Sequence, residues 1–245
     1  MANSRHQDRF NECYENWLQI QQQDLQELLH ATNQQDAQDE QTLCSLVSKT
    51  LQHYEDYCER RTHLAQEDAA SLFSPTWCTS LENSYLWIAG CRPSMSIRLI
   101  YSLCGSQLEA QLAEFLQGVR RGNLAELSAN QLTQINSLQC KTVREEDKLS
   151  SRMASIQEDM ADHPLVGMAS RRGGSDEDVD RAIEERVGAL SSVLVDADKL
   201  RVSTIKDLVD VLTPLQAVDL LIAAKQLHIS IHEWGKRRDG RRGRR

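Results

Sequence analysis

The sequence predicts an all-α protein, a bundle of long amphipathic helices with no β-sheet. Only 4 of the 245 residues are proline and 5% are aromatic, a composition typical of helical proteins. Apolar residues recur at steps of three and four over long stretches, which is the period of an α-helix. No stretch alternates apolar and polar residues as a half-buried strand does.

The N-terminal third is expected to form two long helices. The first covers about residues 4–31 and the second about residues 41–68, with a polar loop at residues 32–40 between them. Each helix carries an apolar face at helical spacing. The face of the first helix includes Phe10, Tyr14, Trp17, Leu25 and Leu28, and that of the second includes Leu43, Leu51, Tyr54 and Cys58.

The middle of the chain is expected to contain shorter helices and one very long one. A helix is predicted over residues 77–88, followed by a turn at residues 90–93, because Pro93 disfavours helix at the residue before it. The next helix begins at Ser94 and is expected to end at Gly105, with another over residues 108–116. Ser128 and Gln131 have the spacing of a capping box, which opens a long helix to about residue 162.

Pro164 and three glycines predict a flexible linker at residues 163–177. The linker divides the chain into an N-terminal helical part, residues 1–162, and a C-terminal helical part, residues 178–235. The second part is expected to hold one helix up to Leu194, one over residues 200–211, and a final apolar helix. Thr213 and Gln216 suit the start of that last helix, and Gly235 is expected to end it.

The last ten residues, 236–245, form a basic tail on an acidic protein. Residues 1–235 carry 21 basic and 35 acidic residues, a net charge of −14, whereas the tail carries +6. A body of that charge repels nucleic acid by itself. The tail indicates a nuclear import signal, a nucleic-acid-binding arm or a solvated disordered terminus. Its cations are Lys236, Arg237, Arg238, Arg241, Arg242, Arg244 and Arg245.

The absence of targeting and catalytic signatures narrows the classes of function. No apolar run is long enough for a membrane span, and the N-terminus lacks the apolar core of a signal peptide. We therefore expect the protein in the nucleus and cytoplasm, with no membrane partner. No phosphate-binding loop, dinucleotide fingerprint or nucleophile elbow is present, so we expect no enzyme.

His228 and His232 stand out as a histidine pair on the last helix. Residues four apart lie on adjacent turns of one face, and this spacing can bind a transition metal through two nitrogens. A single haem cannot take both axial ligands from one helix, so one histidine would bind the iron and the other would support it. Ordinary structural histidines remain the alternative.

Three segments in this order resemble a plant delay-of-germination (seed dormancy) domain, which also forms the C-terminal part of TGA-type bZIP transcription factors. They are residues 87–94 (WIAGCRPS), 98–105 (RLIYSLCG) and 212–235. The resemblance covers nearly the whole chain, from about Phe10 to Trp234. It implies a regulator of seed dormancy and germination that acts in abscisic acid signalling by binding partner proteins.

The resemblance also implies roles for particular residues. Tyr14 and Trp17 match a docking element for clade A type 2C protein phosphatases, and His228 and His232 match a pair linked to haem binding. From the residues alone, Tyr14 and Trp17 suit a helix core equally well. Homo-oligomerisation is a further expectation.

The alternative function is a transcriptional regulator that associates with DNA-bound complexes, as TGA-type relatives do. No basic region followed by leucine heptads is present, so we do not expect DNA contact without a partner.

Overall fold

The computed structural model describes residues 2–33, 39–115, 127–162, 165–170 and 176–242, and most of them are helical. No β-strand occurs within these ranges. The predicted all-α fold is therefore confirmed.

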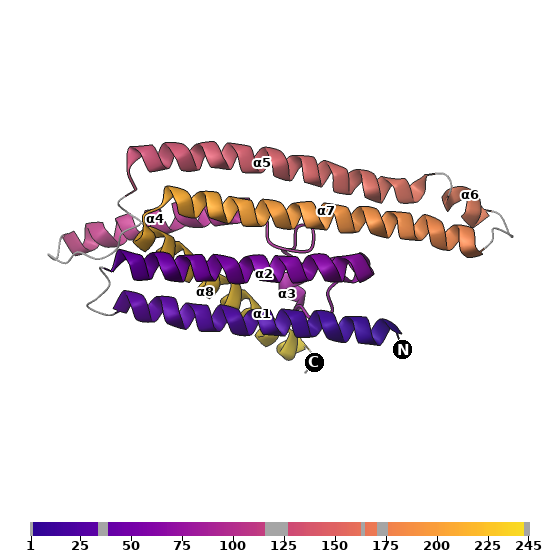
Figure 1. The fold of residues 1–245 in the computed structure, drawn as a ribbon, viewed down its shortest axis with the longest axis horizontal. Helices are drawn as coiled ribbons and strands as arrows, with labels where there is room; N and C mark the ends of the chain where they lie inside the picture. The colour runs from indigo at the N-terminus through magenta and orange to yellow at the C-terminus, as the bar shows by residue number, and fades with distance from the viewer. Residues whose placement is uncertain (1, 34–38, 116–126, 163–164, 171–175, 243–245) are drawn as a thin grey trace.

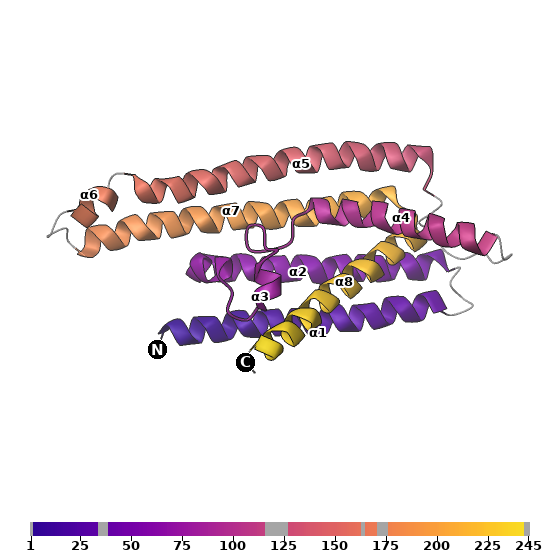
Figure 2. The same ribbon diagram turned by 180° about the vertical axis from the view of Figure 1, so that it is seen from behind.

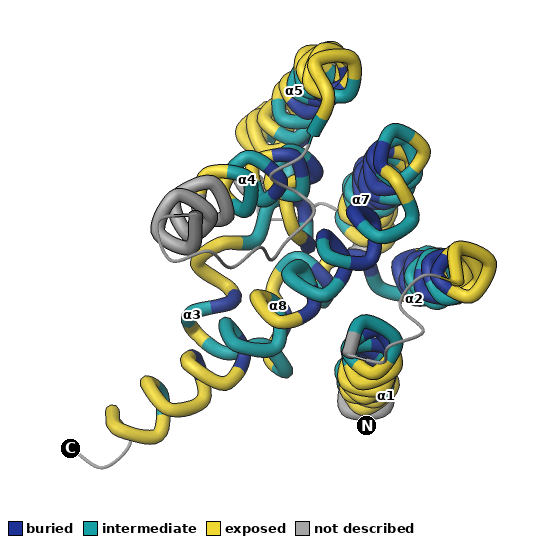
Figure 3. The backbone as a smooth tube through the Cα atoms, turned by 90° about the vertical axis from the view of Figure 1, so that its left-hand side faces the viewer, coloured by how far each residue is buried: buried dark blue, intermediate teal, exposed yellow. Residues whose placement is uncertain are grey.

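Four long helices lie side by side in one layer, and they follow the order α1–α2–α7–α5 across it (Figures 1 and 3). Their bounds are Ala2–Asn33 for α1, Glu40–Phe73 for α2, Ala129–Glu158 for α5 and Asp176–Val211 for α7. At about 1.5 Å per residue, α7 alone is roughly 54 Å long. The layer is accordingly long and narrow.

Three further helices cover one face of this layer. They are α3 (Ser80–Asn83), α4 (Ser94–Phe115) and α8 (Pro214–Arg242). Figure 2 shows α8 crossing α1 and α2 obliquely, with its C-terminal end close to α3. The main core lies where the N-terminal half of α8 meets the other helices. Its fully buried side chains include Leu28, Ile97, Ile100, Ile135, Leu208, Val218 and Leu220.

Both predicted capping boxes are present. The hydroxyl of Thr213 accepts from the amide of Gln216 at 3.3 Å, and the Gln216 side chain accepts from the amide of Thr213 at 3.0 Å. Ser128 and Gln131 make the same two bonds, at 3.2 and 2.9 Å. The side-chain nitrogen Nε2 of Gln131 also donates to Gln216 Oε1 at 2.8 Å. This hydrogen bond joins the first turns of α5 and α8.

The predicted helix stops at Gly105 and Gly235 are wrong. α4 continues to Phe115 and α8 to Arg242. A glycine inside a helix costs only about 1 kcal/mol, so packing can override it. At Gly235 the packing reason is visible, because a Cβ there would lie 2.0 Å from Thr79 Oγ1. Close contact between α8 and α3 requires glycine at that position.

Several other boundaries also differ from the predictions. α2 continues to Phe73 and kinks at Asp68, where the sequence predicted its end. α7 is one helix where two were expected, and α5 ends at Glu158 before a 3₁₀ turn at Asp159–Ala161. Within the expected linker, Leu165–Ser170 form the short helix α6. The remainder of that linker, up to residue 175, lies outside the described residues.

The helix predicted over residues 77–88 is wrong as well. Only α3 is helical there, and Trp87–Gly90 form a tight turn. Ile88 and Ala89 both have positive φ angles, 44° and 55°. Residues other than glycine rarely adopt positive φ angles. They keep such angles only where the surrounding structure holds the backbone in place.

Candidate functional site

An apolar cavity of about 310 Å³ lies between α1, α2, the α3–α4 connection and α8. Its volume is at the lower end of the roughly 300–1,000 Å³ typical of ligand sites. Tyr14 and Trp17 line it from α1, and His228 lines it from α8. The cavity therefore brings together two segments that were singled out separately in the sequence. Further aromatic lining comes from Phe10, Tyr54, Tyr57, Trp77 and Tyr85.

Tyr14 and Trp17 are buried, each with 7% of its surface exposed. The Trp17 ring stacks on Tyr57 with 4.4 Å between centroids, and Lys225 Nζ lies 5.9 Å from the Trp17 centroid. The Tyr14 hydroxyl donates a hydrogen bond to Glu82. Both side chains point into the bundle in this conformation, so neither offers a large surface to a partner.

The two histidines have different surroundings. His232 is buried, its Nδ1 lies 3.0 and 3.1 Å from the two Glu82 carboxylate oxygens, and it is not part of the cavity wall. His228 borders the cavity, with its ring edge-on to Tyr14 at 6.5 Å between centroids. Burial lowers the pKa of His228 to about 4. The charge of Glu82 opposes this shift, and His232 and Lys225 add to it. His228 is therefore neutral at physiological pH.

Glu82 joins the two predicted segments, and the sequence analysis missed it. It accepts from the Tyr14 hydroxyl, from the Thr79 amide at 2.7 Å and from His232. Burial raises the pKa of Glu82, but the hydrogen bonds from Thr79, Tyr14 and His232 outweigh it and leave the pKa below its usual value. The spacing Thr79-x-x-Glu82 is a capping box, a signal that could have identified α3 from the sequence.

A second buried ionic contact joins the same helices. Lys225 Nζ of α8 lies 2.9 Å from Asp24 Oδ2 of α1, and the two side chains are 4% and 2% exposed. The other Asp24 oxygen lies 2.8 Å from Nδ1 of His53 on α2. Burial lowers the pKa of Lys225, and Asp24 opposes that shift. Neither residue was predicted as buried, because charged residues are rarely inside a protein unless they are paired.

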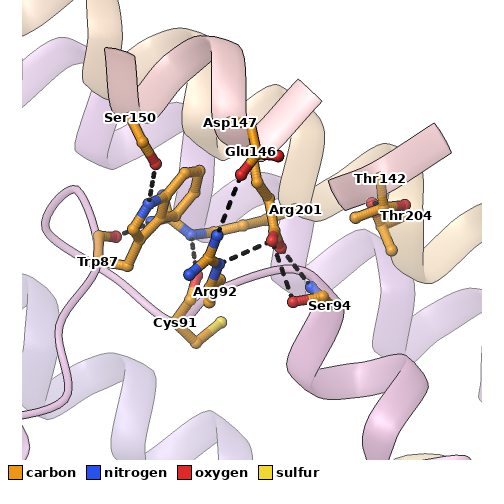
Figure 4. Close-up of polar contacts among 10 residues, drawn as sticks. All are labelled: Trp87, Cys91, Arg92, Ser94, Thr142, Glu146, Asp147, Ser150, Arg201 and Thr204. Carbon is orange, nitrogen blue, oxygen red and sulfur yellow. Dashed lines mark hydrogen bonds and ion pairs between the residues drawn. The ribbon is translucent and has the colours of Figure 1, made fainter. Parts of the chain in front are cut away.

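The first motif of the family resemblance, residues 87–94, has a structural role (Figure 4). Arg201 of α7 donates to the carbonyl oxygens of Trp87, Ile88 and Cys91 at 2.5, 2.9 and 2.7 Å, which holds the tight turn in place. The Trp87 indole donates to Ser150 of α5 at 3.0 Å.

Glu146 of α5 anchors the start of α4. Its carboxylate accepts from Arg92 Nε at 2.7 Å and from the Ser94 amide at 2.6 Å, as Figure 4 shows. The motif thus fixes the path of the chain between α3 and α4, beside the cavity.

The basic tail begins as a continuation of α8. Lys236, Arg237, Arg238, Arg241 and Arg242 are helical and exposed, whereas Arg244 and Arg245 lie outside the described residues. The extended helix is attached to α3, because the Asp239 carboxylate accepts from both the amide and the hydroxyl of Ser80 at 2.9 Å. The disordered-terminus interpretation is therefore wrong for residues 236–242.

Other kinds of site find no support in the described part of the chain. No three His, Cys, Asp or Glu side chains gather there in a way that could hold a metal ion. None of the described helices combines the length and apolarity needed to cross a membrane.

Comparison with known proteins identifies the family. The family described as seed dormancy control (DOG1) matches residues 24–102. DOG1-like 3 from Arabidopsis thaliana is 38% identical over 94% of this chain and 85% of its own length. RESPONSE TO ABA AND SALT 1 from the same plant is 26% identical, covering 95% of this chain and 97% of its own. The transcription factor TGA6 is 26% identical over 93% of this chain but only 62% of its own length. The chain therefore belongs to the DOG1 family of seed dormancy control proteins.

Proposed function

We propose that this protein regulates seed dormancy and germination in abscisic acid signalling by binding partner proteins, type 2C protein phosphatases among them, and not by catalysis. Membership of the dormancy family and the name of the relative RESPONSE TO ABA AND SALT 1 support this role. The main structural support is the meeting of Tyr14, Trp17 and His228 in one cavity. The family resemblance implies binding roles for both of the segments that meet there.

Tyr14 and Trp17 would serve partner binding by positioning other groups. Tyr14 ties α1 to Glu82 and, through it, to α8, while Trp17 packs between α2 and Lys225. Two helices far apart in sequence are thereby held in one arrangement. A rigid surface loses less conformational entropy on binding than a mobile one does.

Binding of the purified chain to a recombinant clade A type 2C phosphatase is the direct test. We expect saturable binding by biolayer interferometry, together with reduced phosphatase activity. A gel-shift assay with the DNA element bound by TGA-type factors provides the comparison. A specific DNA complex combined with no phosphatase binding would contradict the proposal and favour the transcriptional alternative, which the likeness to TGA6 supports.

We also propose haem as a ligand, with His228 as the iron ligand and His232 as a supporting residue. A neutral imidazole is the form that coordinates iron, and the lowered pKa of His228 provides it. Aromatic side chains of the kind that pack on a porphyrin face line the cavity. Its volume of about 310 Å³ is smaller than a whole haem, so the ring would project from the cavity or widen it. His232 fits the supporting role, because its Nδ1 is engaged by Glu82 outside the cavity wall. Bound haem would supply a redox-active or gas-binding iron.

Titration with haemin should separate the two histidines. His228→Ala is expected to abolish the shifted Soret band. His232→Ala should weaken affinity less than His228→Ala does, because His232 reaches the cavity only through Glu82 and Tyr14. His63→Ala is the control, since His63 is exposed and outside the cavity wall.

The pH dependence of haemin binding follows from the pKa of His228. Protonation removes the ligand, so binding should persist at pH 5.5 and weaken only as pH falls towards about 4. Equal losses in the two histidine variants, or a midpoint near pH 6.5, would contradict the assignment of His228.

The basic end of α8 supports a nuclear location in addition to a cytoplasmic one. Its five cations within residues 236–242 are exposed and therefore accessible to an import receptor.

A further inference from the structure

One end of the apolar cavity carries buried positive charge. Arg61 of α2 and Arg201 of α7 both border the cavity, and only 7% and 3% of their surfaces are exposed. Among the described residues, Asp198 is the only acid within ion-pair distance of them, at 2.6 Å from Arg201 Nη1 and 3.4 Å from Arg61 Nε. Arginine stays charged even when it is buried. Two cations that share one anion therefore leave one positive charge in excess at this end.

The two arginines differ in how far the protein satisfies their hydrogen-bond donors. Arg201 donates to Asp198 and to the carbonyl oxygens of the turn at residues 87–91 (Figure 4). Arg61 donates from Nη2 to the Ala89 carbonyl at 2.6 Å. Its buried Nε makes no hydrogen bond within the described part of the chain. A buried guanidinium with unused donors is costly, and an anion in the cavity would lower that cost.

The other charged groups of the cavity wall are compensated by neighbours. Glu82 is the only acid among the described residues that line the cavity, and it accepts hydrogen bonds from α1, α8 and the start of α3. Lys225 is paired with Asp24 at 2.9 Å. The uncompensated charge is therefore that of Arg61, and it favours a ligand with a single negative charge.

The rest of the wall is strongly aromatic. The chain has 4 tryptophans, 5 tyrosines and 3 phenylalanines, and seven of these twelve residues line this one cavity. Aromatic faces pack favourably on flat rings. A volume of about 310 Å³ suits a compact molecule rather than an extended one. The wall therefore favours a ligand with one or two rings.

The cavity is open to the surface. Tyr85, Met95 and Leu227 all line it, and all three are exposed large hydrophobic residues. They come from the α3–α4 connection, from α4 and from α8. A small apolar ligand can therefore enter without separating the long helices.

We propose that this cavity binds a compact, ring-containing monocarboxylic acid, whose carboxylate accepts hydrogen bonds from Arg61 and whose ring packs against the aromatic wall. A guanidinium matches a carboxylate in geometry and charge. The ligand would supply the one negative charge that the Arg61–Asp198–Arg201 cluster lacks. The inference concerns a ligand other than haem, and it does not depend on the binding of a partner protein.

Two matched probes test the role of the charge. 2-Naphthoate carries a carboxylate, and 2-naphthamide has the same ring system without the charge. Isothermal titration calorimetry on the full chain without haemin should show the acid binding at least about 10-fold more tightly than the amide, because hydrogen bonds between charged groups are the stronger ones. In Arg61→Met the acid should lose this advantage. Arg60→Met is the control, since Arg60 is the exposed neighbour on α2 outside the cavity wall.

A second variant tests the position of the ring without changing any charge. Ala224 lines the cavity from α8, so Ala224→Phe should fill the space and abolish binding of both probes. Circular dichroism checks that each variant keeps its helicity, and Ala224→Phe decides the matter if Arg61→Met does not fold.

Several results would overturn the inference. They are no binding of 2-naphthoate, equal binding of the acid and the amide, or an unchanged affinity for the acid in Arg61→Met or Ala224→Phe. Decanoate is titrated in parallel, and tighter binding of this straight-chain acid than of 2-naphthoate would contradict a ring-containing ligand. Binding of the phosphatase is measured separately, so failure here leaves the proposed function standing.

Discussion

Replacement of Arg201 by methionine is expected to lower the free energy of unfolding by about 3–5 kcal/mol, the usual loss when one partner of a buried ion pair is removed. Arg201 is 3% exposed, and its guanidinium lies 2.6 Å from Asp198. It also donates to the carbonyls of Trp87, Ile88 and Cys91. Methionine would fill similar space. However, the Asp198 carboxylate and the three carbonyl oxygens of the turn would lose the hydrogen bonds that Arg201 donates to them. The turn with positive φ angles would lose the side chain that holds it.

Chemical denaturation followed by circular dichroism measures this change. Arg152→Met is the matched control, because Arg152 joins α5 to α7 through Asp196 at 2.7 Å but the two side chains are 44% and 39% exposed. An exposed pair of this kind contributes at most about 1 kcal/mol. If the two variants lose similar amounts of unfolding free energy, burial does not determine how much the Arg201–Asp198 pair contributes to stability.

The Arg201 contacts also explain why the sequence predicted a helix up to residue 88 and placed the turn at residues 90–93, when the tight turn lies at Trp87–Gly90. The apolar spacing of residues 77–88 favours a helix, and the residues that prevent one lie more than 100 positions later in the chain. Local patterns contain no information about such a partner. The same holds for α7, where Asp198 lies between the two predicted helices but is buried against Arg61 and Arg201. The two predicted helices are consequently one.

The structural features that depend only on residues within one or two helical turns were predicted correctly. The apolar faces of α1 and α2 and the capping boxes at Ser128 and Thr213 were identified from local spacing alone. Gly235 failed as a stop signal because its role is contact with Thr79, which is distant in sequence.

The candidate site was predicted in separate pieces, and only the fold joins them. Tyr14 and His228 were each identified by their own motif, but nothing in the sequence indicated that they share a cavity. Glu82, which connects Tyr14 to His232, looked like one acid among many. A buried carboxylate needs hydrogen-bond donors from several elements, and those donors are brought together by tertiary packing.

The second large effect is expected at Lys225. Its substitution by methionine should destabilise the protein by about 3–5 kcal/mol, because Asp24 would remain buried with only His53 beside it. The charge on Lys225 also faces the Trp17 ring, a contact that methionine lacks. Thermal and urea unfolding would both report the change. Lys49→Met is the control, since its ion pair with Glu27 also attaches to α1 but joins it to α2 on the exposed surface.

A double variant determines the origin of that loss. If the cost comes from an uncompensated buried carboxylate, then Asp24→Leu combined with Lys225→Met should recover most of the stability, because apolar replacement of a whole buried pair is often neutral or favourable. If the double variant is as unstable as the sum of the single variants, the two residues act independently. The explanation by ion pairing would then be wrong, and loss of packing around Trp17 would account for the effect of Lys225.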